Sequence, residues 1–97
     1  MLALKPDTRL FLGEDIMIQA IPELDHYYVF NVKNGDHFEL NHTAYWTLEA
    51  IGQGVTLAEL KSRFANRFEL NNKIAEKDLT EVIRFGLNNH IIKEIQA

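Results

Sequence analysis

The chain has 97 residues, a formal net charge of −4, 46% hydrophobic residues and no cysteine. This length supports one hydrophobic core, and the lack of cysteine excludes disulfides and thiolate chemistry. The acidic balance disfavours nucleic-acid binding, which depends on neutralising phosphates. No apolar run is long enough to span a bilayer, and the first residues lack the pattern of a signal peptide. We therefore expect one cytoplasmic domain over residues 1–97 with no membrane partner, of which residues 1–8 are loosely held.

The first half of the chain has the patterns of β-strands. Residues 9–12 form a short apolar run, residues 16–20 alternate apolar and polar side chains, and residues 27–32 are rich in aromatic and β-branched side chains. Alternation with a period of two is typical of a half-buried strand. Asn34-Gly35 follows, a pair that readily takes the positive φ angles of a tight hairpin turn. Residues 37–40 are then the returning strand of a three-stranded antiparallel meander.

Helical signals begin immediately after this strand. The side-chain oxygen of Asn41 can accept from the free N–H groups of a first helical turn. Residues 42–51 are apolar on most sides, as the most enclosed helix of a small domain is. Thr56 and Glu59 have the spacing of a capping box, in which each satisfies a backbone N–H of the other's turn. A second helix is expected to start there.

A third helix is predicted over residues 76–89, and a last short strand over residues 91–95. Gly86 lies on the inward face of this helix, where it either allows close approach of another backbone or leaves room for a large side chain. The predicted fold class is α+β: a three-stranded antiparallel sheet followed by a three-helix bundle like a winged helix-turn-helix.

One run of residues resembles a known family. Leu40-Asn41-His42-Thr43-Ala44-Tyr45-Trp46-Thr47-Leu48, continuing to Gly54, is similar to the L-N-x-T-A passage of PqqD-like proteins, which are named after pyrroloquinoline quinone biosynthesis protein D. Asn89-His90-Ile91-Ile92 resembles the closing x-G-L-I of that family, with His90 where glycine is common. The resemblance covers roughly residues 9–95.

The resemblance implies a binding role rather than catalysis. PqqD-like proteins are recognition elements for the precursors of ribosomally made, modified peptides. The implied function is a non-catalytic chaperone without a cofactor, which binds the leader segment of a precursor peptide by strand addition. It would present that peptide to a modifying enzyme, often a radical S-adenosylmethionine enzyme. The leader would add to the strand over residues 37–40, in a groove beside the helix over residues 76–89.

Strand addition needs a free backbone edge and pockets for alternate side chains. On the third helix, Phe85 falls about 100° from Gly86 and off the buried stripe. Its ring therefore either lines a groove or packs as ordinary core. Lys77 and Arg84 lie on the outer side, where they either meet an acidic leader or are simply solvated. The predicted peptide-binding residues are His37, Phe38, Glu39, Leu40, Lys77, Val82, Arg84 and Phe85.

The main alternative function is a winged-helix transcription regulator, whose third helix would enter the major groove of DNA. The outer face of that helix mixes basic with acidic side chains, which is poor for phosphate contacts. A third reading is a structural or dimerising subunit. Residues 27–30 are apolar on both faces of their strand, so the N-terminal residues or a partner, including a second copy in a homodimer, would cover one face.

The sequence has no convincing catalytic or metal-binding constellation. His37, Glu39 and His42 are close enough in sequence to suggest a metal site, but exposed side chains on an edge strand are the simpler explanation. Ser62 is the only serine, on a charged helix face. We therefore expect neither enzymatic activity nor a bound metal.

Overall fold

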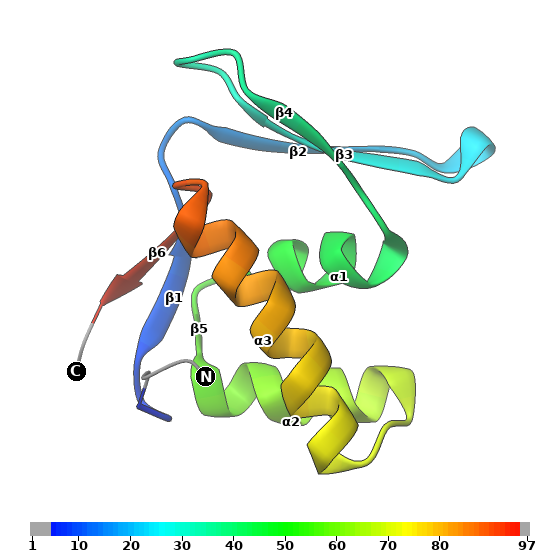
Figure 1. Ribbon diagram of the computed structural model, residues 1–97, viewed down its shortest axis with the longest axis vertical. Coiled ribbons are helices and arrows are strands. Elements are labelled where there is room, and N and C mark those ends of the chain that lie inside the picture. The colour runs from blue at the N-terminus through cyan, green and yellow to red at the C-terminus, as the bar shows by residue number, and fades with distance from the viewer. Residues whose placement is uncertain (1–4, 96–97) are drawn as a thin grey trace.

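The computed structural model describes residues 5–95, which fold into two small sheets and three helices (Figure 1). In chain order the elements are β1 (Arg9–Leu12), β2 (Ile16–Ile21), the 3-10 turn η1 (Pro22–Leu24), β3 (His26–Asn31), β4 (His37–Leu40), α1 (His42–Ile51), β5 (Val55–Thr56), α2 (Leu57–Phe68), α3 (Asn72–Asn88) and β6 (Ile92–Ile95). The α+β class with three helices is confirmed.

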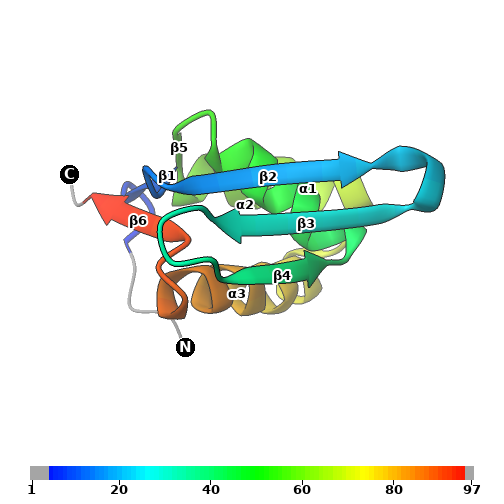
Figure 2. The same cartoon turned by 90° about the horizontal axis from the view of Figure 1, so that it is seen from above.

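The larger sheet is the predicted antiparallel meander, in the order β2-β3-β4. Seen from above, its strands form one layer over the helices (Figure 2). The smaller sheet has the order β5-β1-β6, with both neighbours antiparallel to β1. The predicted strands at the two ends of the chain therefore pair with each other, and β5, with two residues, was not predicted.

The hairpin between β3 and β4 differs from the expected tight turn. Only Gly35 takes a positive φ, +83°, and Asn34 does not. The N–H of Asn31 donates to the carbonyl of Asp36 at 2.8 Å, which closes a five-residue loop over residues 32–36. The reason is local: the side-chain oxygen of Asn31 accepts from the N–H groups of Lys33 and Asn34, which holds the loop in a wider turn.

The third helix begins four residues earlier than predicted. Its N-cap is Asn71, whose Oδ1 accepts from the N–H of Ile74 at 2.9 Å, so residues 72–75 are helical. At the other end, His90 has a φ of +59°. This left-handed backbone explains why glycine suits that position in the PqqD-like motif.

The two caps that the sequence predicted are confirmed. Asn41 Oδ1 accepts from the N–H of Ala44 at 2.7 Å, and Thr56 and Glu59 form the complete capping box.

A Cβ atom added at Gly86 would overlap the side chain of Ile92. Gly86 is therefore a concession to a large side chain, not to a second backbone.

The core lies between the helices and both sheets and has fully buried side chains from every helix, including Leu48, Leu60, Phe64, Leu79 and Ile83. Each such side chain contributes about 1.5–3 kcal/mol by leaving water. No helix within residues 5–95 is long and apolar enough to cross a membrane.

Part of the N-terminal segment is anchored to α2. The carbonyls of Pro6 and Thr8 accept from Ala58 and Leu57, the first N–H groups of that helix, at 3.0 and 2.9 Å. Of residues 1–8, which we expected to be loosely held, residues 1–4 lie outside the described part of the chain.

Candidate functional site

β4 is an open edge of the larger sheet. Hydrogen bonds alternate along an antiparallel pair, and the bond from Asn31 to Asp36 fixes the phase. In this register Phe38 and Leu40 exchange their backbone hydrogen bonds with β3. The N–H and C=O groups of His37 and Glu39 therefore point away from β3, toward the open edge.

An aromatic pair connects this edge to α3. The ring of Phe38 lies edge-on to that of Phe85, with centroids 5.1 Å apart and planes at 85°. Both side chains are half-buried against the core, so each keeps an exposed part. Phe85 is thus neither simple core nor free surface. Val82, also half-buried, lies about 60° around the helix from it, toward the buried stripe.

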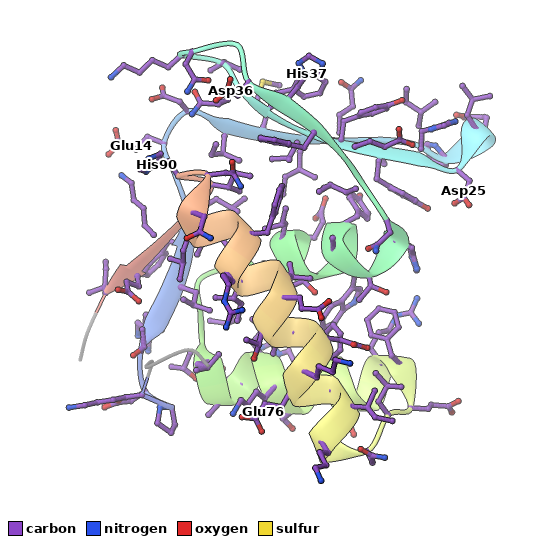
Figure 3. The ribbon with its side chains drawn as sticks, in the orientation of Figure 1. Glu14, Asp25, Asp36, His37, Glu76 and His90 are labelled. Carbon is purple, nitrogen blue, oxygen red and sulfur yellow. The ribbon has the colours of Figure 1, made fainter. Side chains whose placement is uncertain are left out.

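The side chains of His37 and Glu39 lie on the opposite face of the sheet from Phe38. The ring of His37 stacks against that of Phe30, with centroids 6.1 Å apart. The carboxylate of Glu39 lies within hydrogen-bond distance of His26 Nδ1, at 3.0 Å. Figure 3 shows His37 above the sheet, away from the helices. These two residues offer backbone groups at the edge, while their side chains do not reach α3.

Leu40 is 6% exposed and packs in the core, so its side chain has little surface to offer a ligand. Lys77 and Arg84 are exposed and line a hollow of about 370 Å³ on the outer face of α3. They lie about 80–100° around the helix from Phe85. Within the predicted set, the rings of Phe38 and Phe85 meet, Val82 lies about 60° around α3 from Phe85, and the two cations lie on the adjoining face.

Sequence reasoning missed Ile74. This side chain is 46% exposed and lies about 20° around the helix from Phe85, three turns closer to the N-terminus of α3. It was outside the helix as predicted, so no helical face was assigned to it. Reading Asn71 as an N-cap would have placed Ile74 in the same row as Phe85.

The metal ligands considered from the sequence, His37, Glu39 and His42, do not come together at this edge. Within the part of the chain that the structure describes, no group of three or more His, Asp or Glu side chains could hold a metal ion. His42 lies apart from His37 and Glu39, packed against the rings of Tyr27 and Phe68 at 5.6 and 6.2 Å. What the geometry offers is a backbone edge beside partly exposed apolar side chains.

Two solved structures have this fold. "Lasso peptide synthetase B1 complexed with the leader peptide" aligns with a TM-score of 0.72 and 17% identity, over 87% of this chain and 96% of that one. "TbiB1 in Complex with the TbiA(beta) Leader Peptide" aligns with a TM-score of 0.76 and 14% identity, over 90% and 99%. No protein-family model and no curated protein matches the sequence.

At these identities the likeness concerns the fold. The chain has the predicted α+β fold and shares it with both solved structures: a β-meander over three helices, with a second small sheet in this chain. The alignments span nearly the whole of both solved chains, so this is a likeness of complete domains.

Proposed function

We propose that this protein is a leader-peptide-binding chaperone. It holds the leader of a ribosomally made precursor peptide as an added strand on β4 and presents that peptide to a modifying enzyme. The observation that carries the proposal is the open edge of β4, with the outward backbone groups of His37 and Glu39 beside the Phe38–Phe85 pair.

Strand addition at β4 explains the division of roles among the side chains. The backbone groups of His37 and Glu39 would supply the hydrogen bonds, which recognise any extended segment. Alternate side chains of the leader would point toward α3 and cover the exposed parts of Phe38, Phe85 and Ile74. These apolar contacts would select leaders with apolar residues at every second position.

The adjoining face of α3 provides a preference for charge. Lys73, Lys77 and Arg84 line the outer hollow together with Glu76 and Glu81. The cations are in slight excess and all five are exposed. An acidic residue of the leader that leaves the strand there would gain a modest, salt-sensitive attraction.

The fold neighbours support this proposal through what their titles state. Both solved chains are named as complexes with a leader peptide. This chain shares their fold, and its open edge at β4 gives it the means for the same kind of binding.

The test is a two-dimensional NMR titration of labelled protein with synthetic leaders of the small precursor peptides encoded beside its gene. We expect micromolar affinity and shifts concentrated in residues 36–41 and 74–89. Duplex DNA at low salt is the comparison, because it binds the rival winged-helix regulator through the outer face of α3. Shifts with DNA and none with the leaders would overturn the proposal.

A further inference from the structure

The larger sheet has a second open edge, β2. The register with β3 turns the N–H and C=O groups of Ile18 and Ala20 away from the sheet. Natural edge strands are usually protected by charged side chains, proline or a bulge. Residues 16–21, Ile-Met-Ile-Gln-Ala-Ile, have no charge, no proline and no positive φ. This edge is two residues longer than β4 and is left fully able to pair.

A hollow with both apolar and polar lining accompanies this edge. Leu12 and Ile18 line it on the sheet side, and Glu49, Gly52 and Gln53 line it at the end of α1, around a volume of about 260 Å³. Ile18 is on the helix-facing side of its strand and half-buried. An inward side chain of a strand added to β2 would enter this hollow, as strand addition requires.

Carboxylates surround the edge. Glu14 and Asp15 precede β2, and Glu23 and Asp25 follow it. Figure 3 shows Glu14 and Asp25 at opposite ends of the strand. Glu14 is paired with Lys93 at 3.6 Å, while no ion pair among residues 5–95 includes Glu23 or Asp25.

Two carboxylates near β2, Asp25 and Glu49, accept hydrogen bonds from tyrosines. The Tyr27 hydroxyl donates to Asp25 at 3.1 Å, and this bond raises the pKa of Tyr27. A hydrogen bond to Glu49 likewise raises the pKa of Tyr45. Each tyrosine hydroxyl thus stays protonated and donates a hydrogen bond to a carboxylate. We define the acidic rim of β2 as Glu23, Asp25 and Glu49.

The acidic flanks argue against a second copy of this chain as the occupant. An antiparallel copy along β2 would bring its Glu23 and Asp25 beside Glu14 and Asp15. Like charges directly opposite each other destabilise a strand pair. The same flanks attract a strand of the opposite charge.

We propose that β2 is a second strand-addition edge, which takes an extended apolar segment with lysine or arginine at its ends from a partner protein. The surroundings of the two edges would then differ, with mixed charges on α3 beside β4 and carboxylates around β2. β2 and β4 are the two opposite edges of one three-stranded sheet, so both can be occupied at the same time (Figure 2). This inference does not depend on the leader-binding proposal.

The probe is a blocked synthetic peptide, acetyl-Lys-Thr-Val-Thr-Val-Thr-Lys-amide, with a counterpart in which both lysines are glutamates. Each is titrated to about 1 mM into labelled protein and followed by NMR. We expect the basic peptide to shift residues 16–21 and 49–53, and its affinity to fall at high salt because salt screens the rim. The acidic peptide should leave residues 16–21 unchanged.

Two variants sharpen the test. Neutralising the acidic rim (Glu23→Gln, Asp25→Asn and Glu49→Gln together) should weaken binding roughly tenfold, because three exposed carboxylates no longer attract the two lysines of the peptide. The matched control neutralises Asp7, Glu69 and Glu94, which are exposed elsewhere, and should leave the affinity within about twofold.

Ala20→Pro removes one outward N–H without touching the bonds to β3, so it should abolish the shifts along β2. Circular dichroism checks that the Ala20→Pro variant folds. If it does not fold, the neutralised-rim variant tests the inference instead. The inference is overturned if the basic peptide shifts nothing in β2, if the acidic peptide shifts it equally, or if the rim variant binds as before. Shifts in residues 36–41 belong to the leader site, so failure of one proposal is distinguishable from failure of the other.

Discussion

Truncating Phe85 to alanine should affect both the free energy of unfolding and the affinity for the leader peptide. Complete burial makes a Phe→Ala change cost about 3–5 kcal/mol; Phe85 is half-buried, so we expect about 2 kcal/mol. About 1 kcal/mol of this is the edge-on pair with Phe38. A domain of this length has a free energy of unfolding of about 5–15 kcal/mol, so Phe85→Ala should remain folded at 25 °C.

The effect on binding comes from the exposed part of the ring. A leader strand on β4 would cover that part, and losing the contact should weaken leader affinity about five- to thirtyfold, or about 1–2 kcal/mol. Fluorescence anisotropy of a labelled leader measures the affinity. Urea unfolding, followed through the single tryptophan Trp46, which packs edge-on to Phe64 in the core, measures the stability.

Leu87→Ala is the matched control. Leu87 is also half-buried on α3 but lies about 160° around the helix from Phe85. It should lose stability without losing leader affinity. A double-mutant cycle of Phe38→Leu and Phe85→Leu should give a coupling of about 0.5–1.5 kcal/mol in unfolding. If Phe85→Ala leaves both stability and leader affinity intact, the ring has no part in the site.

Four further predictions follow from the described geometry. Ile74→Asp should weaken leader binding about tenfold by replacing an exposed apolar contact with a charge, while its 46% exposure keeps the change in unfolding free energy below about 0.5 kcal/mol; anisotropy and urea titrations check both. Gly86→Ala should lower the free energy of unfolding by about 1–2 kcal/mol, because overpacking against β6 exceeds the gain in helix propensity; a more stable variant would contradict the clash. His90→Gly should raise the free energy of unfolding by about 0.5 kcal/mol, because the relief of a left-handed backbone at histidine exceeds the cost of the greater freedom that glycine gives the unfolded chain. Glu59 has its pKa lowered, first by the backbone N–H and then by the hydroxyl of its N-cap partner, so its stabilisation is present at neutral pH and is lost as the pH falls through the folded pKa. Glu59→Gln should therefore be less stable than the parent at pH 7, and equal to it once the carboxyl is protonated in both states, in thermal unfolding across that range.

The meander and the first two helices could be predicted because their signals are local. Alternation in residues 16–20 and the spacing of Thr56 and Glu59 each act within one element. The pairing of β1 with β6 joins opposite ends of the chain, and nothing local in Arg9–Leu12 specifies that partner.

The candidate site was predicted in part. Phe85 could be placed off the buried stripe of its helix, but only the fold shows that it meets Phe38. The period of two already put the side chains of His37 and Glu39 on the other face, so their side chains were weaker candidates than their backbone groups. Ile74 was missed because Asn71 was taken as part of a loop, although asparagine is a common helix N-cap.

Amide hydrogen exchange tests strand addition at β4 most directly. The N–H groups of His37 and Glu39 point to the open edge, while that of Phe38 is bonded to β3. On adding a saturating leader peptide, we predict at least roughly tenfold slower exchange at His37 and Glu39, because each gains a hydrogen bond, with Phe38 nearly unchanged. A leader that binds while the exchange of His37 and Glu39 stays as fast as in the free protein would contradict the proposed mode of binding.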